Sequence, residues 1–367
     1  MEINQAVAVW CLLGRKAGDN TQVLALADEL GCGYEEKHIR ARPWELLVHL
    51  GRGASLAGID RGASTVLQAP WPDLVISAGR RNEPVARWIK QQSGGRTALV
   101  HMGRPWARLD QWDLVVTTPQ YFLPPRHNIL HNSLPLHRMR REQLAEAGAA
   151  LRPQLRDLPR PWIAVLVGGD SGRFVLTTAK GERLGALANA LAAACGGSLL
   201  VTDSPRTPVQ AGDALQSGLT VPNYCYRWGG AGVNPYRGLL ALADAFVVTG
   251  ESMSMLGEAS AMGRPLFIFD VGDGSQAWWR LSHSYRYKPL SHRLAMALGP
   301  VRMRREIGNI QTVLVAGGMA RWLEPGTVTE ASAELLAPVV ADNRAGSLAA
   351  RELAATAAAV RRLLTDR

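Results

Sequence analysis

Short apolar runs alternate with helical patterns along almost the whole of this 367-residue chain. Residues 6–13 (AVAVWCLL), for example, end in the loop GRKAGDN, and residues 21–31 (TQVLALADELG) then place apolar side chains at helical spacing before a glycine. Repeated units of this kind predict parallel strands joined by crossover helices. The pattern therefore indicates the α/β class, with doubly wound sheets covered by helices on both faces.

The alternation is interrupted once, between Arg138 and Arg160, where the chain is polar and basic and ends in LRDLPRPW. A second alternating series starts at residues 162–169 (WIAVLVGG). The length also fits two domains of ordinary size better than one. We therefore predict two Rossmann-like domains, 1–155 and 156–340, and a C-terminal alanine-rich helix, 341–367, that packs back on the first domain.

The charge of the chain favours an anionic partner. Its formal net charge is +10, while 47% hydrophobic and 20% charged residues are typical of a soluble globular protein. A nucleotide, a nucleic acid or an acidic membrane surface would suit this balance, and a merely basic surface is the alternative. Four widely spaced cysteines show no CxxC pair, which favours a reduced, cytoplasmic protein and gives no metal-ligand spacing.

One stretch, VVTGESMSMLGEASAMGRPLFIF at residues 247–269, has the pattern strand, turn, short helix, strand. After Gly250, Ser252 or Ser254 can cap the helix, whose first-turn N–H groups are then a ready phosphate site. Glu258, one turn further on, can accept the two hydroxyls of a ribose. The alternative is a capped helix with a solvated glutamate.

Two further loops of the second half follow predicted strands. The loop GGDSG is rich in small residues, which let backbone N–H groups approach an anion. Gln276 and Arg280 follow the strand PLFIFD. Ligands of open α/β sheets bind at the carboxyl ends of the strands, where all these loops lie. The loop residues that we assign to ligand binding are Gly168, Gly169, Ser171, Gly172, Gly250, Ser252, Ser254 and Gln276, and Arg280 is a further candidate for holding an anion.

The first half has equivalent loops, GRKAGDN (14–20) and GRRNEP (79–84). Lys16, Arg80 and Arg81 are candidates for holding an anion. Asp19 or Glu83 is a candidate general base. In the alternative interpretation, Asp19 simply caps the helix that begins near Thr21.

The segment ADAFVVTGESMSMLGEASAMGRPLFIF resembles the donor half of GT-B glycosyltransferases such as the lipid II-forming N-acetylglucosaminyltransferase. The resemblance implies two Rossmann-like domains facing a cleft, with a nucleotide-diphosphate sugar on the second. It also implies that the GGDSG loop approaches the diphosphate, that Glu258 holds the ribose and that Gln276 touches the donor sugar. The first loop lacks the Gly-His pair of the lipid II enzyme, so no histidine base is carried over, and only one of its two glutamines has a counterpart.

A closer resemblance extends over nearly the whole chain through GRKAGDNTQVLALADELG, LVGGDSGRF and NPYRGLLALADAFVVTGESMSMLGEA. In these segments the chain resembles the bacterial branch of the family named after the plant mitochondrial-fission protein "elongated mitochondria". The bacterial members of that family are described as glycosyltransferases. This resemblance implies a GT-B fold and a metal-independent transfer, with a nucleotide sugar as co-substrate and no further cofactor. No nucleic-acid partner is expected.

The acceptor that this resemblance implies belongs to the cell envelope and is lipid-linked or of the lipopolysaccharide type. From Arg280 to Arg305 the chain carries seven Lys or Arg residues and no acid, which favours a peripheral position on the inner face of the cytoplasmic membrane. Two alternatives stay open. One is a binding or scaffold protein related to the plant fission factors, and the other is a sugar-nucleotide epimerase on the same fold.

Overall fold

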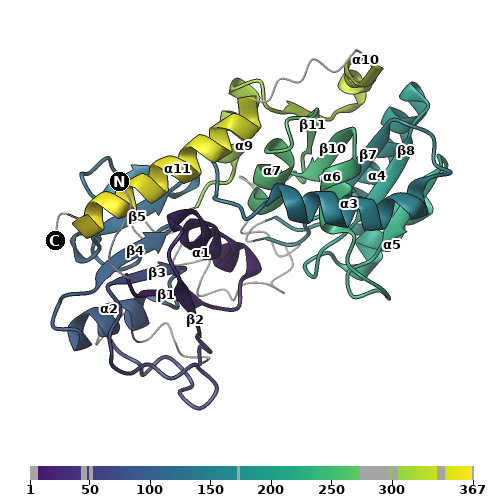
Figure 1. Ribbon diagram of the computed structural model, residues 1–367. Coiled ribbons are helices and arrows are strands. Elements are labelled where there is room, and N and C mark those ends of the chain that lie inside the picture. Colours follow the sequence, from purple (N-terminus) through teal and green to yellow (C-terminus); the bar gives the residue numbers. More distant parts are fainter. Residues whose placement is uncertain are drawn as a thin grey trace. The chain divides into compact units, whose positions relative to one another are not determined.

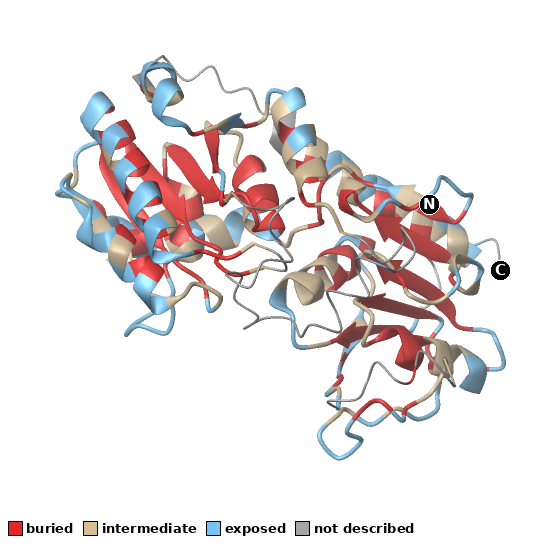
Figure 2. Ribbon diagram, turned by 180° about the vertical axis from the view of Figure 1, so that it is seen from behind, coloured by how far each residue is buried: buried red, intermediate tan, exposed pale blue. Residues whose placement is uncertain are grey.

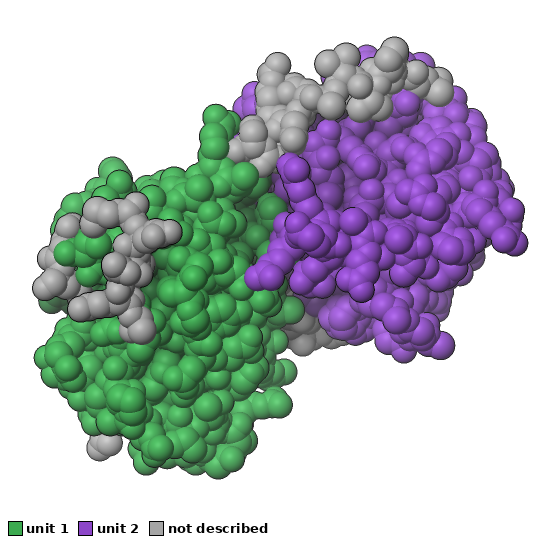
Figure 3. Space-filling model, in the orientation of Figure 1, with its two compact units in different colours: residues 1–138, 295–306, 349–367 green, residues 139–294, 307–348 purple. Residues whose placement is uncertain are grey.

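The computed structural model describes residues 7–42, 48, 53–171, 174–272, 298, 305–336 and 344–365. The chain forms two compact units, coloured green and purple in Figure 3. Unit 1 comprises Met1–Arg138, Ala295–Glu306 and Ala349–Arg367, and unit 2 comprises Met139–Leu294 and Ile307–Leu348.

Within its described residues, unit 1 holds a parallel sheet with the strand order β2-β1-β3-β4-β5-β6 (Figure 1). The order reverses at β1 and β3, which are neighbours although β2 lies between them in sequence. Its elements are β1 (Val9–Leu13), α1 (Ala17–Leu30), β2 (Tyr34–His38), β3 (Leu74–Ala78), α2 (Glu83–Gln92), β4 (Ala98–Met102), η2 (Leu109–Gln111), β5 (Leu114–Thr117), η3 (Pro119–Tyr121), β6 (Ile129–His131) and α11 (Arg344–Thr365).

The described part of unit 2 holds a second parallel sheet, with the order β12-β11-β10-β7-β8-β9. Here the reversal falls between β7 and β10. Its elements are α3 (Arg141–Leu155), β7 (Trp162–Leu166), α4 (Thr178–Cys195), β8 (Ser198–Thr202), α5 (Val209–Ser217), β9 (Asn223–Tyr226), α6 (Tyr236–Leu242), β10 (Ala245–Thr249), α7 (Met253–Ser260), β11 (Leu266–Phe269), α9 (Gly308–Ala316), β12 (Arg321–Trp322), η5 (Pro325–Thr327) and α10 (Val328–Leu336).

The central strands of both sheets are buried on both faces, as Figure 2 shows in red. All five residues of β1, β3, β7 and β10 are buried. Continuous apolar runs such as VWCLL and AFVVT are what a parallel strand between two helix layers requires. Helix α1 buries Val23, Leu26 and Leu30 against its sheet and ends at Gly31, which takes the left-handed conformation with φ 71°.

Helix α3 belongs to unit 2, whereas the sequence led us to place residues up to 155 in the first domain. The physical reason is its close packing on α6. Gly238 of α6 lies so near α3 that a Cβ there would come 2.8 Å from the carbonyl oxygen of Ala147. The C-terminal part of α11 contributes Ala357 and Val360 to the core of unit 1, and Asn132 donates a hydrogen bond of 3.1 Å to Thr356.

The alternation of strands and helices in each unit confirms the predicted α/β class. Several elements occur that the pattern had not predicted, among them β6, α5, α9 and β12. The pattern PWELLVHLG, at residues 43–51, also predicts a helix, but these residues lie mostly outside the described part of the chain. Across the described part of the chain, no helix combines the length and the apolar character needed to span a bilayer.

Candidate functional site

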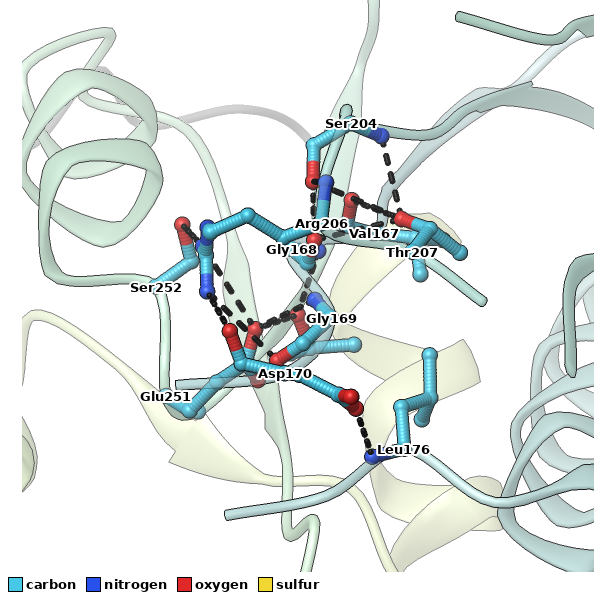
Figure 4. Close-up of polar contacts among 12 residues, drawn as sticks. Val167, Gly168, Gly169, Asp170, Leu176, Ser204, Arg206, Thr207, Glu251 and Ser252 are labelled. Carbon is cyan, nitrogen blue, oxygen red and sulfur yellow. Dashed lines mark hydrogen bonds and ion pairs between the residues drawn. The ribbon is translucent and has the colours of Figure 1, made fainter. Parts of the chain in front are cut away.

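Three loops of unit 2 meet at the carboxyl edge of its sheet. They follow β7, β8 and β10, and these three strands are adjacent in the order β10-β7-β8. The reversal of strand order falls between β10 and β7, which is where open α/β sheets bind their ligands. Figure 4 shows the polar contacts that join the three loops.

The glycine loop after β7 uses its backbone N–H groups within unit 2. Gly168 N donates to Thr249 Oγ1 at 2.8 Å, and Gly169 N donates to Glu251 Oε1 at 2.7 Å. Asp170 N and Ser171 N donate to the carbonyl oxygens of Arg206 and Phe174. We had assigned this loop to a diphosphate through its amides. In this structure the amides of Gly168, Gly169 and Ser171 are bonded to protein groups, and Gly172 lies outside the described residues.

Glycine is required at positions 168 and 169 because neighbouring residues come too close to leave room for a Cβ atom. A Cβ on Gly168 would lie 2.0 Å from Glu251 Oε1 and 2.7 Å from Ser252 Cβ. Gly169 has φ 110°, and a Cβ there would lie 2.3 Å from the carbonyl oxygen of Arg206. The two glycines therefore allow the loops after β8 and β10 to pack closely against the loop after β7.

Arg206, in the loop after β8, joins the three loops. Its guanidinium donates to Asp170 O at 2.9 Å and to Ser252 Oγ at 3.3 Å, and lies 3.8 Å from Glu251 Oε1 (Figure 4). The sequence analysis did not select Arg206 or Glu251. Arg206 follows the strand SLLVT directly in SPRTP, so its position after a strand was a usable signal.

Glu251 is a buried carboxyl at the centre of this cluster. It is 1% exposed, and burial raises its pKa while Arg206 and its hydrogen bonds oppose that shift. Among the described residues its Oε2 is buried without a hydrogen-bond partner. A raised pKa favours the protonated carboxyl, which would not repel a bound anion as a carboxylate would.

The N-terminus of α7 opens at the same edge. Ser252 is the N-cap residue, but its side chain makes no capping hydrogen bond and instead accepts one from Arg206. Gly250 is fixed by hydrogen bonds with Phe269 and Gln311. Ser254, in the first turn, is exposed. A helix N-terminus beside an arginine combines two favourable features for binding a phosphate.

Glu258 is buried rather than exposed on the face of Ser254. It is 8% exposed and accepts a hydrogen bond from the hydroxyl of Tyr236 in α6. Burial raises its pKa to about 7, although the bond from Tyr236 and the charge of Arg237 oppose the shift. Its role toward a ribose stays a prediction. Gln276 and Arg280 lie outside the described residues.

In unit 1, the candidate residues lie at the carboxyl edge around β1 and β3. Lys16 is the N-cap residue of α1, and its Nζ lies 3.8 Å from Asp19 Oδ2. A Cβ on Gly79 would lie 2.7 Å from Asp19 Oδ2, so this carboxylate reaches across to the loop after β3. The side chain of Asp19 is 32% exposed and can reach a ligand. Asn20, next to it, exchanges two hydrogen bonds with the backbone of Gly14 and holds the loop after β1.

Glu83 has a different environment. It is completely buried, and its two carboxylate oxygens accept hydrogen bonds from the backbone N–H groups of Trp106 and Ala107 at 2.8 to 2.9 Å. Burial raises its pKa to about 7. This geometry anchors the loop after β4, whereas the carboxylate of Asp19 is only half-buried. Arg80 and Arg81 are half-buried in the loop after β3.

Similarity to known proteins agrees with the architecture. The protein resembles a crystal structure of the glycotransferase of kitacinnamycin, with a TM-score of 0.51 and 12% identity over 98% of this chain and 100% of that one. It also resembles a protein described as a UDP-N-acetylglucosamine 2-epimerase from Listeria monocytogenes, with a TM-score of 0.53 and 11% identity over 98% of each chain. At such identities the likeness shows the fold, which is GT-B-like.

Sequence comparison identifies the family. The chain is 27% identical over 249 residues to the mitochondrial fission protein ELM1 of Arabidopsis thaliana, a match that covers 61% of this chain and 57% of the plant protein. The aligned region thus spans little more than half of the length of that relative. The model of the family described as mitochondrial fission ELM1 matches residues 17–296, more than half of the chain. The chain therefore belongs to the mitochondrial fission ELM1 family.

Proposed function

We propose that this protein is a glycosyltransferase that binds a nucleotide-diphosphate sugar at the carboxyl edge of unit 2 and an acceptor at the carboxyl edge of unit 1. The observation that carries the proposal is the convergence of Arg206, Ser252 and the N-terminus of α7 at the point where the strand order of unit 2 reverses. Two phosphates need several hydrogen-bond donors and a positive field, and this edge offers both.

The chemistry follows from those positions. In an inverting transfer, Asp19 takes the proton of an acceptor hydroxyl, the hydroxyl oxygen forms a bond to the anomeric carbon, and the bond from that carbon to the diphosphate breaks. The leaving nucleoside diphosphate gains negative charge, which Arg206 and the first turn of α7 stabilise. Glu258, one turn after Ser254 in α7, is proposed to orient the ribose through the carboxylate oxygen that does not accept the hydrogen bond from Tyr236.

We further propose that the acceptor belongs to the cell envelope, either lipid-linked or of the lipopolysaccharide type, and that the protein acts at an anionic membrane surface. The net charge of +10 supports this. The basic run between residues 280 and 304 lies outside the described residues and adds only its sequence to the argument.

The test of donor binding is a thermal-shift screen with UDP-, GDP-, ADP- and CMP-linked sugars. We expect one of them to stabilise the protein, and we expect Arg206→Gln and Glu258→Ala each to weaken its binding by roughly 1 to 3 kcal/mol, the scale of losing hydrogen bonds to a charged group. Arg152→Gln removes an exposed arginine of α3 in the same unit and serves as the matched control.

The test of transfer is Asp19→Asn, which should abolish turnover and leave donor binding intact. Glu83→Gln should instead disturb the loop after β4 and lower the stability of the protein, because Glu83 accepts the backbone hydrogen bonds of that loop. If Asp19→Asn keeps near-normal activity, the base lies elsewhere.

Two results would favour the rival functions. Turnover of the donor without an acceptor would favour an epimerase, the class named for the Listeria relative, and nucleotide binding without any turnover would favour a scaffold, in line with the name of the plant relative.

A further inference from the structure

Three arginines come together at the carboxyl edge of unit 1, and they come from distant parts of the chain. Arg80 follows β3 and Arg104 follows β4, two adjacent strands. Arg305 belongs to a segment that returns to unit 1 from much later in the sequence. Arg305 and Glu306 are fixed to the loop after β5, because Arg305 Nε donates to Gln120 Oε1 at 2.7 Å and Glu306 N donates to Gln120 O at 2.9 Å.

The guanidinium groups are held by aromatic rings and hydrogen bonds. Arg80 lies over the ring of Trp106, 4.9 Å from its centroid, and Arg104 lies over the ring of Tyr121 at 5.6 Å. The loop that carries Arg104 and Trp106 is anchored by Glu83, which accepts hydrogen bonds from the backbone N–H groups of Trp106 and Ala107. All three arginines are half-buried, so their side chains still reach solvent.

Positive charges lie close together in this cluster. Burial, together with the positive charges of Arg305 and Arg80, lowers the pKa of Arg104 to about 10, while Tyr121 and Glu83 oppose the shift. The carboxyl of Glu83, with its pKa raised to about 7 by burial, is only partly ionised near neutral pH. Because Arg305 and Arg80 both act on the pKa of Arg104, three positive charges lie near one another, an arrangement that an anion would stabilise.

We propose that Arg80, Arg104 and Arg305 form a phosphate-binding subsite of unit 1, and that the acceptor of this protein carries a phosphate or diphosphate group. That the phosphate belongs to the acceptor rests on the proposed function, whereas the anion site itself does not depend on it. The planar guanidinium groups of three arginines match the oxygens of a phosphate better than those of a neutral sugar.

The position of the subsite also predicts where the acceptor reacts. Asp19 lies beside the loop after β3, and Arg104 follows the next strand, β4. Strands are spaced by about 4.8 Å, so Asp19 and Arg104 are roughly 5 to 10 Å apart along the edge. The reacting hydroxyl is therefore separated from the phosphate by several bonds.

The experiment measures the binding of inorganic pyrophosphate to the full chain by calorimetry at low and high salt. We expect Arg305→Gln to weaken one class of binding site by about tenfold and Arg104→Gln/Arg305→Gln to abolish it, because each lost charged hydrogen bond costs roughly a factor of ten or more. Arg108→Gln/Arg126→Gln removes two exposed arginines of the same unit and is the matched control. Circular dichroism and thermal unfolding verify that each variant is folded.

The design separates this inference from the proposed function. Arg206→Gln should remove any pyrophosphate bound in unit 2 and leave the unit 1 class intact, whereas Arg104→Gln/Arg305→Gln should leave nucleotide-sugar binding within about twofold. Loss of nucleotide binding alone would refute only the proposed function. Pyrophosphate binding that is equal in the wild type, the Arg104→Gln/Arg305→Gln variant and the matched control would overturn the subsite, even if nucleotide binding is found.

A second arm identifies the source of the phosphate. Glycerol phosphate is the soluble probe, and phosphatidylcholine vesicles with and without phosphatidic acid are the membrane probe. Binding that depends on Arg104 and Arg305 for both probes indicates a lipid-linked acceptor that is recognised through its phosphate. Binding to glycerol phosphate alone indicates a soluble phosphorylated acceptor. If neither probe depends on these arginines, the subsite does not bind phosphate monoesters and the proposal fails for that class.

Discussion

At the scale of single residues, the two most informative side chains are the buried carboxyls Glu83 and Glu258. Burial raises the pKa of each to about 7, against about 4.3 for a solvated glutamate. Between these values the folded protein keeps a proton that the unfolded chain releases. The free energy of unfolding therefore falls as the pH rises from about 4.3 to about 7, and then loses nothing more from these groups.

Glu258→Gln tests this linkage, because glutamine can still accept the hydrogen bond from Tyr236 but does not titrate. A shift of about 2.5 pKa units corresponds to about 3 kcal/mol, so the variant should gain stability relative to the wild type by on the order of 3 kcal/mol between about pH 4.5 and about pH 8. Urea denaturation at both pH values measures it. Glu182→Gln, an exposed position of α4, controls for the lost charge. A constant difference between Glu258→Gln and the wild type at the two pH values would contradict the raised pKa.

The residues that the sequence analysis selected and those it missed differ in a physical way. Asp19, Gly168 and Ser252 were found because strand-to-helix loops are readable from local pattern. Arg206 and Glu251 were not, and Arg305 was counted only in the basic run assigned to a membrane surface, because their contacts depend on partners far along the chain. Arg206 meets Ser252 across 46 positions, and Arg305 meets Gln120 across 185. Local pattern also could not reveal that the backbone N–H groups of the glycine loop donate hydrogen bonds to Thr249 and Glu251.

At the scale of secondary-structure elements, apolar runs located the central strands well, because buried parallel strands leave a continuous signal. Helix α5 was missed, since VQAGDALQS has few large apolar residues. Its burial depends on glycines of another helix. A Cβ on Gly181 of α4 would lie 2.1 Å from the carbonyl oxygen of Ala211, and one on Gly185 would lie 2.7 Å from that of Leu215.

Gly181→Ala sets two effects against each other. Alanine favours a helix over glycine by about 1 kcal/mol, but the added methyl would meet backbone that cannot rotate away. We expect packing to win and the variant to lose about 1 to 3 kcal/mol of unfolding free energy. Ala186→Gly, at an exposed position of α4, measures the propensity term in the same helix. If Gly181→Ala instead stabilises the protein by the amount that Ala186→Gly costs, the contact between α4 and α5 is looser than described.

At the scale of the whole molecule, each unit has its own sheet and its own core. Val165, Val247 and Phe267 belong to the core of unit 2, whereas Cys11, Ile76 and Val100 belong to a core of unit 1. The division could be predicted from the interruption after Arg138, but its boundary depended on the contact between α3 and α6, which joins residues far apart in sequence. The two proposed ligands are likewise assigned to different units, a nucleotide sugar to unit 2 and a phosphorylated acceptor to unit 1.

This division predicts that each ligand stabilises one unit. A ligand at about 100 times its dissociation constant adds about 2.7 kcal/mol to the stability of the form that binds it. With the nucleotide sugar, amide hydrogen exchange should slow in loops 168–171 and 204–207 and then throughout the core of unit 2, while the core amides of unit 1 keep their rates. Pyrophosphate should slow exchange in loop 104–107, which Glu83 anchors, and in Arg104→Gln/Arg305→Gln this effect should disappear. Equal protection of both cores by the nucleotide sugar would mean that the units unfold as one, and protection confined to unit 1 would move the donor site out of unit 2.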